Sequence, residues 1–182
     1  MYRRNLPHWY PDGANVFVTW RLFGSLPTKA LSHISDGVAF RDADRRLDLA
    51  TGGPIWLKEP MVAQRVVAVI EAAEPERGLC VLHEYVVMPN HVHLLIRPIR
   101  HLSQVTKWIK GASARMANQC LGRTGQPFWQ DDSFDHWVRN EPEFEKIRNY
   151  IRNNPVHAGL VCEPEQWPYS SAGRGRSKEV TG

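Results

Sequence analysis

The sequence has few cysteines and no long apolar run, and these absences exclude several classes of protein. Only 3 of its 182 residues are cysteine, and none forms a CxxC pair. A disulfide scaffold and a zinc ribbon are therefore not expected. No window approaches the roughly 18 apolar residues of a membrane span, and the N-terminus lacks the apolar core of a signal peptide. We expect a cytoplasmic protein with no membrane partner.

Acidic residues are absent from the middle of the chain. No Asp or Glu occurs between Glu84 and Asp131, although Lys and Arg number 23 and Asp and Glu 19 overall. Positive charge is therefore concentrated in one segment, as a phosphate-binding surface needs. The alternative is a solvated face that is balanced by acids folded back from elsewhere. The candidate phosphate-contacting residues are Arg97, Arg100, Lys107, Lys110, Arg115 and Arg123.

The hydrophobic pattern predicts one α+β domain. Hydrophobic residues make up 42% of the chain and charged residues 23%, an ordinary globular balance. Period-two and helical patterns predict strands over 15–22, 80–87, 91–97 and 133–138, and helices from 60 to near 75, over 102–121 and over 140–154. This order predicts a ferredoxin-like sandwich, an antiparallel sheet with helices on one face. We expect a single domain over 1–182 with a core over 14–172, an irregular insertion over 24–56 and a frayed tail over 173–182.

Residues typical of helix ends support these boundaries. Ser103 is a candidate N-cap of the second helix. Asn140, followed three residues later by Glu143, forms a capping-box pattern at the start of the third helix. Pro155 is expected to end that helix, because proline disfavours helical geometry in the residue before it.

The triplet His91-Val92-His93 is the first candidate for chemistry. Residues two apart on a strand point to the same side, so both imidazoles would project from one face. Two imidazoles on one face can bind a divalent metal. The triplet is a weak signal by itself, and a half-buried pair with ordinary hydrogen bonds is the alternative.

Tyr150 is the second candidate. It lies four residues before Asn154, so the two share one helix face, at the edge of the apolar stripe. The alternative is a packed tyrosine whose hydroxyl is satisfied locally. The two candidates together have a chemical logic, because a tyrosine hydroxyl can attack a phosphodiester that a metal polarises. His91, His93 and a side-chain carbonyl such as that of Asn154 would leave positions on Mg²⁺ or Mn²⁺ open for phosphate oxygens.

Long segments of the chain resemble a known family. Residues 85–96, YVVMPNHVHLLI, are similar to the HUH segment of bacterial single-tyrosine transposases of small insertion sequences, and residues 150–161, YIRNNPVHAGLV, to their tyrosine helix. Residues 127–130, PFWQ, 135–139, DHWVR, and 165–172, EQWPYSSA, resemble the branch called REP-associated tyrosine transposases. The resemblance covers residues 14–172 in the right order.

The resemblance implies an enzyme with the HUH fold. Tyr150 would be the nucleophile, which cleaves single-stranded DNA through a 5′-phosphotyrosine intermediate, and His91, His93 and Asn154 would bind Mg²⁺ or Mn²⁺. The partner would be single-stranded DNA with REP-like hairpins, contacted by the six basic residues named above, in the bacterial cytoplasm and at the nucleoid when DNA is bound. Whether the protein is a monomer or a homodimer is undecided from the sequence.

Two other functions stay open at this stage. A domesticated protein with the same sheet and basic helix could bind REP hairpins without cleaving them. A metal-dependent hydrolase could use His91 and His93 with a carboxylate base. Few acids lie near the two histidines in the sequence, so the base would have to be a distant Asp that folds in.

Overall fold

The computed structural model describes residues 11, 13–25 and 53–175. A four-stranded antiparallel sheet lies at its centre, in the order β2-β3-β1-β4. Residues 26–52 of the predicted insertion and residues 176–182 of the predicted tail lie outside the described residues. The elements are β1 (Asn15–Arg21), η2 (Trp56–Lys58), α2 (Pro60–Ala72), β2 (Cys80–Val87), β3 (His91–Pro98), α3 (Leu102–Cys120), β4 (Phe134–Val138), α4 (Glu141–His157) and η3 (Pro164–Gln166).

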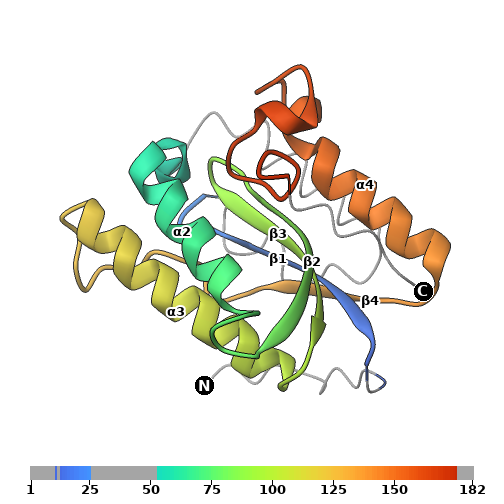
Figure 1. Cartoon of the computed structure of the whole chain (residues 1–182). Coiled ribbons are helices and arrows are strands. Elements are labelled where there is room, and N and C mark those ends of the chain that lie inside the picture. The colour runs from blue at the N-terminus through green and yellow to red at the C-terminus, as the bar shows by residue number, and fades with distance from the viewer. Residues whose placement is uncertain (1–10, 12, 26–52, 176–182) are drawn as a thin grey trace.

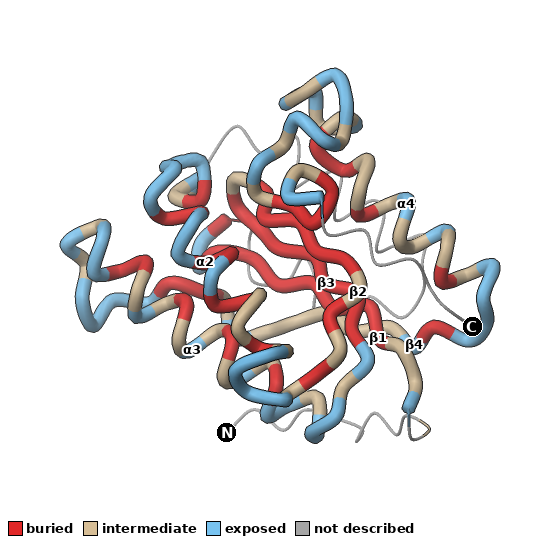
Figure 2. Tube along the Cα trace, viewed as in Figure 1, coloured by how far each residue is buried: buried red, intermediate tan, exposed pale blue. Residues whose placement is uncertain are grey.

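The two faces of the sheet pack against different helices (Figure 1). Alternate residues of β1 point to opposite faces, as strand geometry requires. Val16, Val18 and Trp20 belong to the larger buried cluster, which includes residues of α2 and α3. Phe17 belongs to a second buried cluster with Phe144 and Ile151 of α4. Figure 2 shows the buried strands between these helical layers.

The α+β fold with an antiparallel sheet, predicted from the sequence, is confirmed. α2 and α3 share one face, as predicted, but the prediction that all helices lie on one face is wrong, because α4 covers the opposite face. The amphipathic pattern of α4 shows that one of its sides is buried, but not which face of the sheet receives it. None of the helices described is both long and apolar enough to cross a membrane.

The turn between β2 and β3 is anchored from two sides. Next to the turn, its two strands pair in register from Val87 and Val92 to Glu84 and Leu95. The Pro89 carbonyl accepts a hydrogen bond from the Leu57 N–H (3.2 Å), and the Asn90 carbonyl accepts one from the Leu22 N–H (2.8 Å). These bonds fix the backbone immediately before His91.

The C-terminal segment packs against the outer edge of β2. The Val87 N–H donates to the Tyr169 carbonyl (2.8 Å), and the Trp167 indole N–H donates to the Val87 carbonyl (3.0 Å). The Ser171 N–H donates to the Tyr85 carbonyl (3.0 Å). Backbone groups at the edge of β2, which would otherwise be unpaired, are satisfied in this way.

α4 begins as predicted but continues past Pro155. The Asn140 side chain accepts from the Glu143 N–H (2.9 Å), which confirms the predicted cap. The prediction that Pro155 ends the helix is wrong, because α4 runs to His157. Pro155 has no N–H to donate, but the helix continues for two more residues and its end is set by Gly159 at φ 69°. The Leu160 N–H donates to the Pro155 carbonyl (2.9 Å), which satisfies the last turn.

The N-cap of α3 is His101, and the prediction of Ser103 is wrong. The imidazole Nδ1 of His101 accepts from the Ser103 N–H at 3.4 Å and lies 2.8 Å from the Ser103 hydroxyl. An imidazole acceptor can satisfy a helical N–H as a carboxamide does, but histidine is not a residue type that favours N-caps. The sequence pattern therefore predicted Ser103, which lies two positions later and is of a residue type that favours N-caps.

We predict an acid-sensitive contribution from Glu143 at the start of α4. Burial raises the pKa of this carboxyl, but the Arg139 N–H (2.8 Å) and His136 Nε2 (2.9 Å) outweigh it and lower the pKa below 4.5. A lowered pKa stabilises the fold above the unfolded value, and that stabilisation is lost as pH falls through the folded value. Glu143→Gln should therefore destabilise the protein near pH 7 by up to about 1 kcal/mol.

Urea unfolding at a series of pH values tests this expectation. The difference between wild type and Glu143→Gln should shrink below pH 4.5, where the wild-type carboxyl becomes protonated. Glu141→Gln, in the same turn but at an exposed carboxylate, should give a smaller difference. If the difference in free energy of unfolding between wild type and Glu143→Gln stays constant from pH 7 to pH 3, the ionised Glu143 carboxylate is not the cause of the stabilisation.

Candidate active site

His91 and His93 lie on the face of β3 that α4 covers. Their Nε2 atoms are 3.0 Å apart, and both residues are 0% exposed. Phe17 stacks on the His93 ring, with centroids 5.6 Å apart and planes 23° apart. The predicted projection of both imidazoles from one face is therefore what the structure shows.

Each imidazole has a second contact that orients its ring. His91 Nδ1 lies 2.6 Å from the side-chain oxygen of Asn90, and His93 Nδ1 lies 2.7 Å from the Thr19 hydroxyl. An amide oxygen only accepts, so His91 carries its proton on Nδ1 and presents a lone pair at Nε2. The Thr19 hydroxyl can donate or accept, so it is compatible with either tautomer of His93.

The two imidazoles fit a divalent metal as neighbouring ligands. The two Nε2 atoms, 3.0 Å apart, are close enough together to bind one cation between them. The oriented Nδ1 atoms supply the outer hydrogen bonds that metal-binding histidines usually have. No group of three or more His, Cys, Asp or Glu side chains that could bind a metal occurs in the described part of the chain. Any further protein ligand would therefore come from another residue type, such as the amide of Asn154.

Tyr150 of α4 packs directly against this pair. Its ring centroid is 5.6 Å from that of His93 and 6.2 Å from that of Phe17, and the side chain is half-buried. Asn154, one turn later on α4, is 1% exposed. Tyr150 and the two histidines thus come together within a single chain, through contacts between residues more than 50 positions apart.

A buried ion pair fixes α4 on the sheet near Tyr150. The Arg148 Nε donates to Glu84 of β2 at 3.1 Å, and the Ser171 hydroxyl donates to the other carboxylate oxygen. Glu84 is 1% exposed. Burial lowers the pKa of Arg148, but its hydrogen bonds to Glu84 and Glu145 outweigh this and raise it. One carboxylate therefore ties β2, α4 and the C-terminal segment together.

Arg21 adds a buried positive charge to the same face. It pairs with His91 in the β1–β3 register, so their side chains point to one side of the sheet. Arg21 is 1% exposed, and its guanidinium lies 3.4 Å from the Ser25 hydroxyl. Burial lowers the pKa of Arg21, and the charge of Asp132 partly offsets this. A cation at this position favours an anion near the histidines.

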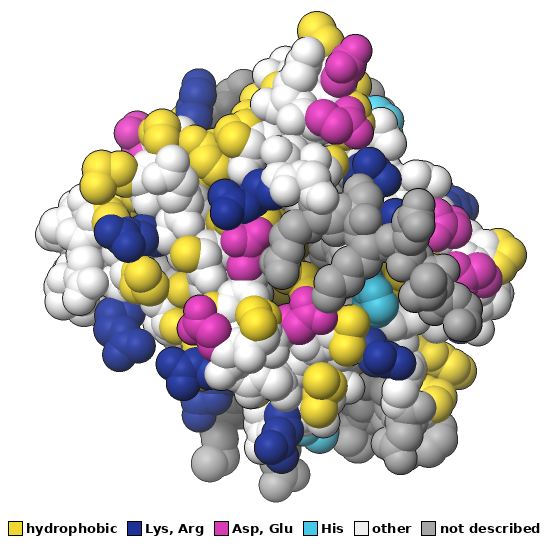
Figure 3. All heavy atoms as spheres, in the orientation of Figure 1, with side chains coloured by type: hydrophobic (Ala, Val, Ile, Leu, Met, Phe, Trp, Pro, Cys, Tyr) yellow, Lys and Arg dark blue, Asp and Glu magenta, His cyan; other side chains and the backbone are white. Residues whose placement is uncertain are grey.

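The six candidate phosphate-contacting residues do not form one patch. Arg97 shares a face of β3 with the histidines but lies at the far end, and Arg100 is exposed in the following loop. Lys107 and Arg115 are exposed on α3, on the other side of the sheet. In the view of Figure 3, Lys and Arg side chains are scattered, with several over the side where α3 lies.

Two of these six side chains make specific contacts within the protein. The Lys110 ammonium donates to the backbone carbonyls of Gln130 (2.7 Å) and Asp131 (2.9 Å). The guanidinium of Arg123 lies 3.9 Å from the centroid of the Trp56 ring, in a cation–π contact. Both residues therefore help to fix local structure around α3, whatever else they contact.

Three residues of the site were not predicted from the sequence: Asn90, Thr19 and Arg21. Asn90 was included only in the family-like segment 85–96, although its place next to His91 could have suggested a role. Thr19 and Arg21 are contributed by the register of β1 on β3, which pairs residues 74 and 70 positions apart. No local pattern in the sequence specifies that register.

A sequence model of the family described as "Transposase IS200 like" matches residues 55–154, more than half of the chain. The chain belongs to this transposase family. The match includes both histidines, Tyr150 and Asn154. The resemblance to transposases found in the sequence is thereby confirmed.

Two known proteins are similar to this chain. A protein of Haemophilus influenzae, described as a REP-associated tyrosine transposase, is 26% identical over 105 residues; the match covers 52% of this chain and 60% of that protein. A solved structure of a REP-associated tyrosine transposase bound to a REP hairpin covers 100% of this chain and 88% of its own, with a TM-score of 0.58 and 19% identity. The second likeness confirms the fold.

We predict that breaking the ion pair beside Tyr150 destabilises the protein strongly. Arg148→Met leaves Glu84 buried without its cationic partner, which should cost about 3 kcal/mol or more of the free energy of unfolding. Arg152→Met, on the same helix, removes a partner of Glu165, which is 59% exposed. This control should cost less than about 1 kcal/mol. Urea unfolding of both variants measures the difference, and equal losses would contradict the importance of the buried pair.

Proposed function

We propose that this transposase cleaves and rejoins single-stranded DNA next to hairpin-forming sequences, with Tyr150 as the nucleophile. The observation that carries the proposal is the contact of the Tyr150 ring with His93, at 5.6 Å between centroids, in a chain of the IS200-like family. A nucleophile beside an oriented histidine pair suits phosphoryl transfer.

In the proposed reaction the Tyr150 oxygen attacks the scissile phosphorus and forms an O–P bond. The bond from phosphorus to the 3′ oxygen breaks, so one DNA segment becomes a 5′-phosphotyrosine and the other leaves with a 3′-hydroxyl. The phenolic proton is lost and one proton is gained by the leaving oxygen. A 3′-hydroxyl can reverse the step, so rejoining needs no nucleotide cofactor.

His91, His93 and Asn154 are the residues we propose to hold Mg²⁺ or Mn²⁺. When bound, the ion would neutralise and polarise the phosphate oxygens. Imidazole donors suit Mn²⁺ better than Mg²⁺, which prefers oxygen ligands. Asn90 and Thr19 would keep the two Nε2 atoms directed at the site, and Arg21 would add positive charge near the phosphate.

The proposed DNA partner follows from the relatives and from charge. The structural neighbour is described as bound to a REP hairpin, and a hairpin with a single-stranded flank is the substrate we propose here. The exposed cations Arg97, Arg100, Lys107 and Arg115 are proposed DNA contacts. Because His91 and His93 are 0% exposed, groups that cover them must move before a phosphate reaches them.

A non-cleaving hairpin-binding protein is the alternative. It would use the same fold and basic residues but would not need a nucleophile beside a histidine pair. The close contact between Tyr150 and His93 favours the enzyme, because nothing in hairpin binding requires it.

Covalent capture tests the proposed nucleophile. Labelled single-stranded DNA that carries a hairpin repeat from beside the gene is incubated with protein and Mn²⁺, and the products are separated under denaturing conditions. Wild type should give a slow, metal-dependent band, and Tyr150→Phe should give none while still binding the hairpin. Tyr169→Phe, at a half-buried tyrosine of the C-terminal segment, should retain the band. A band with Tyr150→Phe would move the nucleophile elsewhere, and binding without any wild-type band would favour the non-cleaving alternative.

Metal binding is tested separately from cleavage. Thr19→Val removes the hydroxyl next to His93 Nδ1 while keeping the shape of the side chain. It should weaken Mn²⁺ binding by roughly 10- to 100-fold, the range found for lost outer hydrogen bonds at metal sites. Calorimetric titration with Mn²⁺ measures the affinity, with Thr124→Val in an exposed loop as the control. Equal affinities for the two variants would exclude Thr19 from this role.

A further inference from the structure

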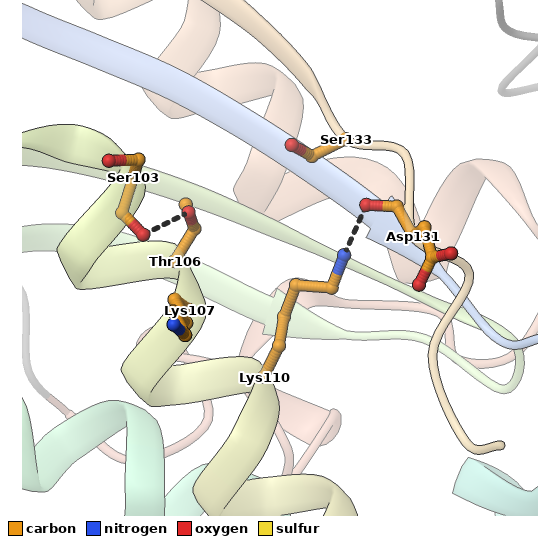
Figure 4. Close-up of a pocket in the computed structure, with 6 residues that line it drawn as sticks. All are labelled: Ser103, Thr106, Lys107, Lys110, Asp131 and Ser133. Carbon is orange, nitrogen blue, oxygen red and sulfur yellow. Dashed lines mark hydrogen bonds between the residues drawn. The ribbon is translucent and has the colours of Figure 1, made fainter. Parts of the chain in front are cut away.

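A polar pocket lies on the side of the sheet opposite to Tyr150. It has a volume of about 260 Å³, between the first turns of α3 and the segment before β4 (Figure 4). Every side chain that lines it is polar or charged: Ser103, Thr106, Lys107, Lys110, Asp131 and Ser133. Hydroxyl and ammonium groups of this kind are the usual protein contacts of phosphate oxygens in DNA.

The two lysines of the pocket have different roles. Lys110 is engaged by the carbonyls of Gln130 and Asp131, and in Figure 4 it extends to the Asp131 backbone. This contact fixes one wall of the pocket to α3. In the part of the chain that the structure describes, no hydrogen bond or ion pair engages the exposed ammonium of Lys107. Lys107 therefore supplies a positive charge that an incoming group can use.

The electrostatic surroundings of the pocket favour an anion in contact with Lys107. α3 contains no acidic residue over its whole length, Leu102–Cys120. Asp131 is the single carboxylate among the lining residues, and Figure 4 shows it beyond Lys110, on the side away from Lys107. The end of the pocket formed by Lys107, Ser103 and Thr106 thus combines one cation with two hydroxyl groups.

The pocket lies within reach of the face that carries Tyr150, around the β4 edge of the sheet. His93, Thr19 and Phe134 pair side by side across β3, β1 and β4. Neighbouring strands are about 4.8 Å apart, so the backbone of Phe134 is roughly 10 Å from that of His93. Ser133 of the pocket directly precedes Phe134, and β4 is the last strand at that side of the sheet. A single strand could pass from one face to the other here within a few nucleotides.

An exposed tryptophan favours a nucleic acid strand over a free phosphate ion. Trp137 of β4 is 38% exposed and pairs with Val16, whose side chain faces α2 and α3. Paired residues share a face, so Trp137 lies on the same side as the pocket. Exposed aromatic rings beside cations are the surfaces on which unpaired bases stack.

We infer that this pocket binds one phosphodiester of the single-stranded DNA as the strand passes around the β4 edge, with Lys107 as its cationic contact and Ser103, Thr106 and Ser133 as its neutral lining. The inference rests on the proposed function, since it assumes a DNA substrate at Tyr150. It adds a second contact region on the opposite face and separates the role of Lys107 from the structural role of Lys110.

Single methylphosphonate substitutions test the inference position by position. Each substitution removes the charge of one phosphate in the hairpin oligonucleotide, and binding to wild type, Lys107→Ala and the control Lys146→Ala is measured by fluorescence anisotropy. Wild type and Lys146→Ala should lose affinity at one position within a few nucleotides of the cleaved bond. Lys107→Ala should bind the unmodified strand more weakly and lose nothing further at that position.

A salt titration supplies a second measurement. Lys107→Ala should reduce the slope of log affinity against log salt by about 0.7, the value for one phosphate of a single strand. The pocket assignment would be overturned if the loss of affinity caused by Lys107→Ala added to the loss caused by methylphosphonate at every position. An unchanged salt slope would overturn it as well. Covalent capture with wild type and the same oligonucleotide is run in parallel. If no covalent product forms, the result counts against the proposed function. If the product forms but the two losses of affinity are additive, the result counts against the pocket alone.

Discussion

The pairing of β1 with β3 is the constraint on which the site depends. It places Thr19 opposite His93 and Arg21 opposite His91, and it sends Val16, Val18 and Trp20 to the other face. A slip of one residue would exchange the two faces of β1, because side chains alternate along a strand. The apolar residues of β1 would then lie under the histidines, and Thr19 would face α2 and α3. The hydrophobic clusters on both faces therefore protect the geometry of the site, and Tyr150 itself packs against the second cluster.

Tyr150 owes its position to contacts outside the site. Its helix is capped by Asn140 at one end and terminated at Gly159 at the other, so α4 is a defined rigid element. Glu84 connects this helix to β2 and to the C-terminal segment through Arg148 and Ser171. A side chain on a helix that is fixed in this way, such as the proposed nucleophile Tyr150, is placed more reproducibly than one on a loop. The motif of the C-terminal segment, 165–172, thereby acquires a structural role in supporting α4 and the edge of β2.

The positive charge of the middle segment is divided among different tasks. Lys110 stabilises the chain before β4, Arg123 packs on Trp56, and Arg97 lies on the face that carries the histidines. Lys107 and Arg115 remain exposed on α3. A basic stretch in a sequence is thus not equivalent to a basic surface, because a lysine ammonium can be used to satisfy backbone carbonyls. DNA recognition in the proposed scheme involves both sides of the sheet, joined at the β4 edge.

The sequence by itself determined the elements, their order, the shared face of His91 and His93, the Asn140 cap and the family. The family follows from the resemblance of long segments to known transposases. The other features follow from local periodicity and from residues a few positions apart, which physical chemistry links directly to backbone geometry. Only the tertiary structure decided that α4 covers the second face, that Asn90, Thr19 and Arg21 surround the histidines, and that Lys110 is engaged while Lys107 is exposed. It also decided that His101 caps α3 and that α4 passes Pro155. The pairing of distant strands and the packing of helices depend on the burial of whole faces at once, so no short segment of the sequence specifies them.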